Sequence, residues 1–146
     1  MSSTPLIYKI LNPVMKTILK SPVHKVVSDG ILIITFKGIK SGKEYSTPIS
    51  YFMESGTVYC FTHAQWWRNL AQGAEVKVRL KGQDTAGFAQ VEAEDIDQKT
   101  SAMRKMVIAK PQEAGFYNVT FDLDGEPVEA EVIKAAEEAV LIRITL

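Results

Sequence analysis

One hairpin-like stretch constrains this chain more than any other feature. An apolar, β-branched run at residues 31–36 (ILIITF) enters a Gly-punctuated basic loop and returns as a second strand-like run at residues 47–53. Such a continuous apolar run is typical of a strand buried on both faces. The loop contains Lys37, Gly38, Lys40, Ser41, Gly42 and Lys43. Because glycines admit positive φ and close approach of backbone N–H groups, the loop is either an anion-binding tip or a plain solubilising turn.

The overall composition indicates one globular domain over residues 1–146. The formal net charge is zero, which gives no reason to expect a nucleic-acid partner. A single cysteine, Cys60, excludes an internal disulfide and suits a reducing cytoplasm. His24, His63 and Cys60 are far apart in the sequence, so no metal-ligand spacing is present and we expect no metal site.

The first 27 residues carry four lysines and no Asp or Glu. Apolar residues recur at helical spacing over residues 5–20, which predicts an amphipathic helix with a basic face. Such a helix either packs its apolar stripe on the core or lies on an anionic membrane surface. Lysines interrupt the apolar residues, so the layout is not that of a signal peptide.

The rest of the chain reads as short strands joined by turns, with three helices. Strands are predicted at residues 31–36, 47–53, 57–62, 76–81, 85–93 (with Phe88 pointing inward) and 140–146, and helices at 65–71, 96–109 and 129–138. Residues 116–123 are predicted to be a further strand or extended segment. Six or seven antiparallel strands with peripheral helices predict an α+β, mainly β fold built on a small barrel.

The short helix predicted at residues 65–71 has an unusual composition for a connector. Trp66 and Trp67 can stack on a flat ring, and Arg68 can clamp an anion. Asn69 can bond to a backbone or ligand amide. The alternative is a barrel end plugged by tryptophan, with Arg68 extending to solvent.

Taken together, GIKSGKEYSTP (residues 38–48), WWRNL (66–70) and VKVRL (76–80) resemble the deazaflavin-dependent nitroreductase family, within the FMN-binding split β-barrel superfamily. The resemblance implies a split β-barrel whose basic loop grips a cofactor phosphate and whose WWRNL helix borders the cofactor. The implied cofactor-binding residues are Lys40, Ser41, Gly42, Lys43, Thr47, Pro48, Trp66, Trp67 and Asn69. The chain departs from the family pattern at residues 62–65, where family members carry a longer Gly-rich loop.

The resemblance also implies an activity. A bound cofactor, FMN or 8-hydroxy-5-deazaflavin (coenzyme F-420), would pass hydride to a quinone or nitroaromatic acceptor. Arg68 would stabilise negative charge, and His63 or Tyr51 would donate a proton, unless His63 is a structural loop residue and Tyr51 a core residue. The alternative is a non-catalytic module that holds a flavin-like or lipophilic ligand. Flavin-binding split barrels are commonly homodimers, and monomers also occur in the deazaflavin branch.

Overall fold

The computed structural model describes residues 30–146, and the chain divides into two units. The described part of the barrel unit comprises residues 30–91 and 142–146, and the helical unit comprises residues 92–141. The helix predicted at residues 5–20, its proposed membrane contact and His24 lie outside the described residues. That residues 1–146 form a single domain stays a prediction. Within residues 30–146, no helix has the length and apolar character that crossing a bilayer requires.

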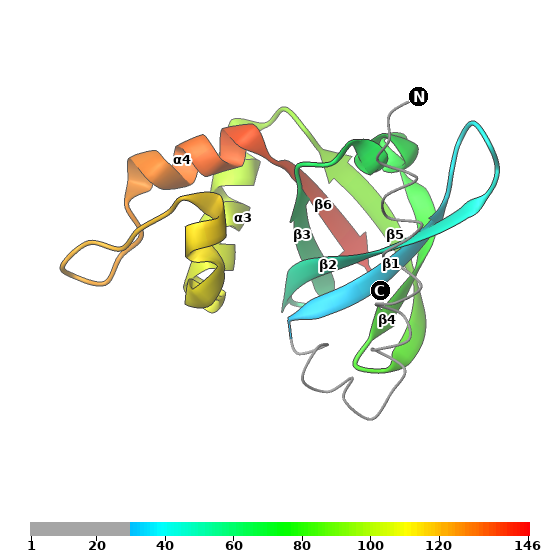
Figure 1. Cartoon of the computed structure of the whole chain (residues 1–146), viewed down its shortest axis with the longest axis horizontal. Helices are drawn as coiled ribbons and strands as arrows, with labels where there is room; N and C mark the ends of the chain where they lie inside the picture. The colour runs from blue at the N-terminus through cyan, green and yellow to red at the C-terminus, as the bar shows by residue number, and fades with distance from the viewer. Residues whose placement is uncertain (1–29) are drawn as a thin grey trace. The chain divides into compact units, whose positions relative to one another are not determined.

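Six strands form the barrel (Figure 1). They are β1 (Ile31–Lys37), β2 (Glu44–Glu54), β3 (Thr57–Thr62), β4 (Ala74–Leu80), β5 (Gln83–Glu92) and β6 (Val140–Thr145). Their order around the closed barrel is β1-β2-β3-β6-β5-β4, and antiparallel pairing of β1 with β4 completes it. The predicted mainly β, antiparallel barrel is confirmed. Of the six or seven strands expected, the barrel contains six.

Alternation along the strands builds the barrel core. Every second residue of β1 (Leu32, Ile34 and Phe36) belongs to one buried apolar cluster, as expected from the period of two. Val76 and Val78 of β4 and Ile142 and Ile144 of β6 complete much of that cluster. Residues 33 and 35 of β1 are also buried, so the prediction of a strand buried on both faces is confirmed.

Two hairpins in the barrel use tight two-residue turns. Ser55 and Gly56 join β2 to β3 with φ of 53° and 79°, and Lys81 and Gly82 join β4 to β5 with φ of 51° and 82°. Positive φ at both central residues characterises type I′ turns, whose twist matches that of the flanking strands.

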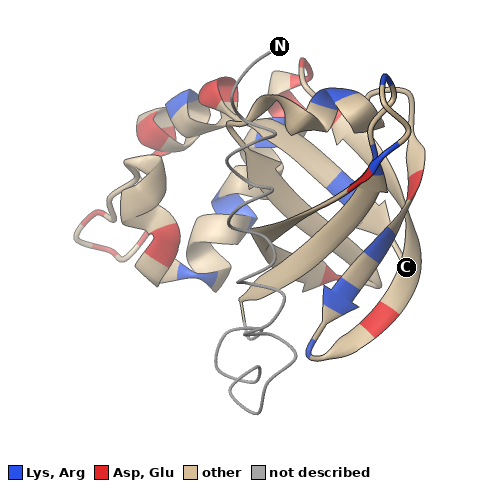
Figure 2. Cartoon of the chain, turned by 45° about the vertical axis from the view of Figure 1, so that its right-hand side comes forward, with Lys and Arg blue, Asp and Glu red and all other residues tan. Residues whose placement is uncertain are grey.

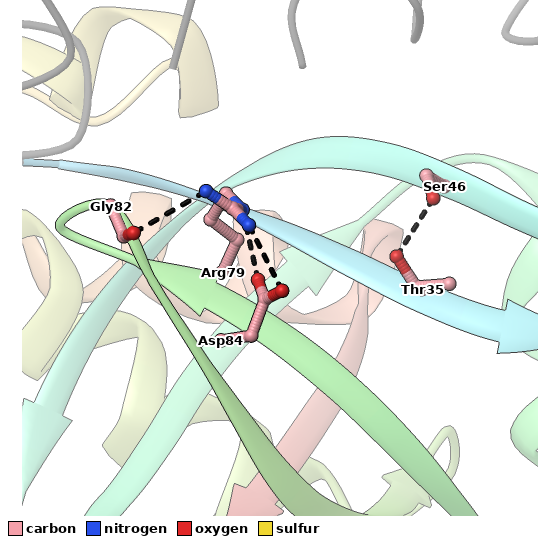
Figure 3. Close-up of polar contacts among 5 residues, drawn as sticks. All are labelled: Thr35, Ser46, Arg79, Gly82 and Asp84. Carbon is pink, nitrogen blue, oxygen red and sulfur yellow. Dashed lines mark hydrogen bonds and ion pairs between the residues drawn. The ribbon is translucent and has the colours of Figure 1, made fainter. Parts of the chain in front are cut away.

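Polar contacts on β1, β2, β4 and β5 reinforce the pairing (Figure 3). The Arg79 guanidinium donates to both carboxylate oxygens of Asp84, at 2.8 and 2.9 Å, and to the Gly82 carbonyl at 3.3 Å. Arg79 therefore ties the turn between β4 and β5 to both strands. Across β1 and β2, the buried hydroxyls of Thr35 and Ser46 share a hydrogen bond of 2.7 Å.

The helical unit consists of α3 (Ile96–Ala109), the 3₁₀ helix η2 (Pro111–Tyr117) and α4 (Glu129–Glu138). α3 packs against both η2 and α4. Asp95 caps α3 by accepting from the N–H groups of Asp97 and Gln98, each at 3.1 Å, which confirms the predicted cap. The predicted bounds of α4 are also confirmed.

Two sequence expectations are wrong. Residues 116–123 form neither a strand nor one continuous extended segment, because Phe116 and Tyr117 end η2 and Asn118 then adopts φ of 60°. Only an isolated bridge between Phe121 and Pro127 follows. Phe88 does not point inward: its side chain is 44% exposed, since β5 pairs with β4 in a register that places Gly87 opposite the buried Val76.

A carboxylate in the helical unit provides a pH-dependent prediction. Hydrogen bonds from the hydroxyl and the N–H of Thr120 (2.7 and 2.8 Å) lower the pKa of Glu131 below its usual 4.5. Since the folded-state pKa is depressed, its contribution to stability is complete above about pH 4.5 and is lost as the pH falls through the folded value. We expect Thr120→Val to raise the pKa of Glu131, as measured by a carbon-13 NMR titration of its carboxyl group. Thr85→Val in β5 is the control, and an unchanged Glu131 pKa in Thr120→Val would contradict the assignment.

Candidate functional site

The basic loop comprises residues 38–43, because Lys37, which the sequence places in the loop, is the last residue of β1. The loop connects β1 to β2 and contains hydrogen bonds of its own. The Gly38 N–H donates to the Lys43 carbonyl at 2.8 Å, and the Gly42 N–H donates to the Gly38 carbonyl at 2.8 Å. The Ser41 hydroxyl oxygen accepts from the Lys43 N–H at 3.1 Å. β2 begins at Glu44, three residues earlier than predicted, so the loop is short.

Glycine is required at two loop positions for different reasons. A Cβ on Gly38 would lie 2.8 Å from Cε2 of Tyr45 and 3.0 Å from the Ser41 hydroxyl oxygen. Gly42 has φ of +69°, which a residue with a side chain rarely adopts, although the space around it is open. Tyr45 also places its hydroxyl 3.3 Å from that of Ser41. Tyr45 of β2 therefore packs against the loop, a role that the sequence analysis does not assign to it.

The predicted helix at residues 65–71 is the 3₁₀ helix η1 (Gln65–Leu70). Trp66 is 6% exposed and stacks on Phe36 with ring centroids 5.3 Å apart, inside the barrel core. Trp67 is half-buried, and the exposed Arg68 guanidinium lies 5.7 Å from the centroid of the Trp67 ring. The two adjacent tryptophans thus have different environments, and Trp67 is the more accessible one.

Asn69 joins η1 to the basic loop. Its Oδ1 accepts the N–H of Ile39 at 3.0 Å, and its Nδ2 donates to the Trp66 carbonyl at 3.0 Å. These two bonds bring the two sequence motifs together, although they are about thirty residues apart in the chain. The amide of Asn69 thus bonds to backbone groups, which is one of the two roles expected for it.

The other predicted site residues lie on or after the strands that follow the loop. Thr47 and Tyr51 of β2 are buried, with 7% and 6% of their surface exposed, and Tyr51 belongs to the barrel core. Pro48 is half-buried opposite Ile33 of β1. His63 follows β3 and is exposed. Tyr51 is therefore poorly placed to exchange protons with an external ligand, whereas His63 is accessible.

The charges around the loop favour anions. Lys40, Lys43 and Arg68 are exposed, and Figure 2 shows basic residues at the hairpin between β1 and β2. In the described part of the barrel unit, Lys and Arg outnumber Asp and Glu, whereas the reverse holds in the helical unit. No cluster of metal-ligating side chains occurs among residues 30–146. The local excess of positive charge would attract anions.

Comparison with solved structures establishes the fold of the chain. A protein described as a domain-swapped dimer has 16% identity and a TM-score of 0.56, covering 98% of this chain and 99% of its own. An F420-H2 dependent reductase has 22% identity and a TM-score of 0.51, covering 79% and 94%. A protein of unknown function from Agrobacterium tumefaciens str. C58 has 15% identity and a TM-score of 0.54, covering 87% and 55%.

The closed six-stranded antiparallel barrel and these similarities define the fold as a split β-barrel with added helices. No protein-family model matches the chain. A comparison with curated proteins likewise gives no match.

Proposed function

We propose that this chain is an oxidoreductase that binds FMN or the deazaflavin coenzyme and reduces a quinone or nitroaromatic acceptor. The observation that carries the proposal is the 3.0 Å bond from the Ile39 N–H to Asn69 Oδ1, which joins the basic loop to η1. A phosphate-binding element and a helix with an accessible tryptophan then lie side by side. The similarity to the fold of an F420-H2 dependent reductase supports the same class of function.

The loop residues fit the phosphate of such a cofactor. Lys40 and Lys43 are exposed and supply positive charge. The main-chain N–H groups of Lys40 and Ser41 have no acceptor among the described residues, so both remain available as donors. Ammonium and amide donors of this kind are the usual partners of phosphate oxygens. We therefore assign phosphate binding to Lys40, Ser41 and Lys43, with Gly42 permitting the turn.

Residues of η1 and the end of β3 would serve the ring and the acceptor. A bound flavin or deazaflavin supplies the hydride chemistry. Trp67 presents the accessible indole, and the Arg68 guanidinium beside it would stabilise negative charge. We assign proton donation to His63, because it is exposed while Tyr51 is a core residue. Trp66 supports the site from inside the barrel rather than by contact with the ligand.

A homodimer is part of the proposal. The similar structure described as a domain-swapped dimer covers nearly the whole of both chains. Light scattering coupled to size-exclusion chromatography measures the mass in solution directly, and a mass of one chain at micromolar concentration would contradict this element of the proposal.

Replacing Lys40 by alanine tests the phosphate assignment. We expect the dissociation constant of the bound cofactor to rise about fivefold at low salt, because an exposed ion pair contributes up to ~1 kcal/mol. The loss should shrink at high salt, where exposed charges are screened. The measurement is a titration with FMN and with the deazaflavin coenzyme, followed by quenching of protein and ligand fluorescence.

The matched control is Lys81→Asn, which removes a lysine at the turn between β4 and β5 and keeps a residue that tolerates positive φ. The antiparallel register of β1 with β4 places this turn at the end of the strands opposite the basic loop. Failure of both ligands to bind the unmodified protein would overturn the proposed function. Tight binding without reduction of menadione would instead support a non-catalytic binding module.

A further inference from the structure

The hydrogen bonds of the basic loop leave a specific pair of donors. The N–H groups of Gly38, Gly42 and Lys43 donate to acceptors within the loop, and that of Ile39 donates to Asn69. The remaining two loop N–H groups, those of Lys40 and Ser41, are consecutive and have no acceptor among the described residues. Both residues are exposed.

The Ser41 hydroxyl, unlike the main-chain N–H of Ser41, is already hydrogen-bonded within the protein. Its oxygen accepts the Lys43 N–H at 3.1 Å and lies 3.3 Å from the hydroxyl of Tyr45. It is therefore engaged in holding the loop, whereas the main-chain N–H of the same residue is available. At Ser41 the donor that remains for an anion is therefore the main-chain N–H, and its placement depends on what fixes the backbone.

Asn69 is the one described residue outside residues 38–45 whose side chain receives a hydrogen bond from the loop. Its other hydrogen bond, to the Trp66 carbonyl, fixes the orientation of the amide within η1. Because Trp66 is packed in the barrel core, η1 provides a rigid support for the loop. Ile39, whose N–H donates to Asn69, immediately precedes Lys40 and Ser41, the two residues with unpaired N–H groups.

We propose that Asn69 is a positioning residue, which fixes the basic loop so that the N–H groups of Lys40 and Ser41 bind the cofactor phosphate. Asn69 does not contact the ligand in this arrangement. The inference rests on the proposed function, because it describes how the same site recognises phosphate. The N–H groups of Lys40 and Ser41 contact the phosphate, whereas the side chains of Ser41 and Asn69 only hold the loop in place.

The first test follows the loop amides by NMR during titration with inorganic phosphate. In the unmodified protein we expect the amide signals of Lys40 and Ser41 to shift. In Asn69→Ala those shifts should be reduced, and hydrogen exchange at Ile39 should accelerate about tenfold, because its acceptor is lost. Asn69→Asp keeps an oxygen that can accept the Ile39 N–H, and it should restore protection of that amide.

The second test separates positioning from general damage to the site. Cofactors with a phosphate (FMN or the deazaflavin coenzyme) are compared with their phosphate-free forms (riboflavin or the deazaflavin riboside). Asn69→Ala should weaken the phosphate-bearing form about threefold to tenfold, since one hydrogen bond is at stake, and leave the phosphate-free form unchanged. Gln65→Ala is the matched control, because Gln65 is an exposed amide residue of η1.

The outcomes distinguish this inference from the proposed function. If Asn69→Ala weakens both forms equally, Asn69 is merely structural and the inference is wrong. If phosphate leaves the Lys40 and Ser41 amide signals of the unmodified protein unmoved, the assignment of the donors is wrong. Phosphate shifts that depend on Asn69, together with no binding of any flavin or deazaflavin, would support the inference and overturn the proposed function.

Discussion

Replacing Trp66 by alanine is expected to lower the free energy of unfolding by about 3–5 kcal/mol, the range for deleting a large buried aromatic side chain. Trp66 is 6% exposed, belongs to the barrel core and stacks on Phe36 at 5.3 Å. Truncation would remove that contact and leave a cavity at the point where η1 meets the barrel. Urea denaturation followed by circular dichroism measures the change.

The neighbouring Trp67→Ala variant is the natural control. Trp67 is only half-buried, so its loss should cost clearly less stability than the loss of Trp66. We expect the reverse order for cofactor affinity, which Trp67→Ala should weaken more than Trp66→Ala. A titration followed by the fluorescence of the cofactor ring measures the two dissociation constants. Equal destabilisation by the two substitutions would contradict the division between a core tryptophan and a ligand-facing one.

This division could not be predicted from the sequence. Adjacent residues of a 3₁₀ helix point in directions about 120° apart, since the helix has three residues per turn. The pattern WWRNL therefore predicts that one tryptophan faces the barrel and the other does not, without saying which. The position of Phe36 decides it, and that position results from the long-range pairing of β1 with β2 and β4.

Some elements can be predicted from local sequence patterns alone, and β4 and α3 are examples. Val76 and Val78 alternate with charged residues, and they are buried in β4 as the period of two requires. Asp95 followed by Gln98 gave the start of α3, because a cap depends on residues within one turn. The predicted beginnings of the six barrel strands lie within three residues of the observed ones. Short connections explain the antiparallel pairing of β1 with β2, of β2 with β3 and of β4 with β5, whereas the pairing of β1 with β4 and the place of β6 beside β3 are long-range.

The region after α3 shows why other local signals fail. Phe116, Tyr117 and Phe121 are residues that favour strands. No strand forms there because Lys110-Pro111 begins a 3₁₀ helix and Asn118 ends it in the left-handed region. The Thr120 N–H then donates to Glu131 of α4 instead of to a neighbouring strand. Tertiary hydrogen bonding overrides β propensity in this segment.

The candidate site was predictable in its parts and not in its connections. Basic residues and glycines identified the loop, and the tryptophans identified η1. An asparagine side chain can bond to a ligand or to backbone groups with equal ease, so the sequence leaves both roles of Asn69 open. Only the approach of Ile39 to Asn69 in the folded barrel shows that the amide supports the loop.

Gly87→Val is expected to destabilise the barrel by about 1–3 kcal/mol or more, the usual range for inserting side-chain atoms into a packed interior. A Cβ at this position would lie 2.7 Å from Cγ2 of Ile144 and 3.2 Å from the carbonyl oxygen of Thr145, both in β6. The expectation opposes intrinsic propensity, because valine favours strands and glycine weakens them. The glycine is needed for the close approach of β6 to β5, which also explains why Phe88 faces outward.

Ala86→Val is the matched control, because Ala86 precedes Gly87 in β5 and is exposed. It adds a β-branched side chain to the same strand without the contact to β6, and we expect its effect on stability to be within about 0.5 kcal/mol, as for ordinary surface substitutions. Urea denaturation of both variants gives the comparison. If Gly87→Val proved as stable as Ala86→Val, β6 would have to be able to withdraw from β5, and the steric reason for Phe88 facing outward would be wrong.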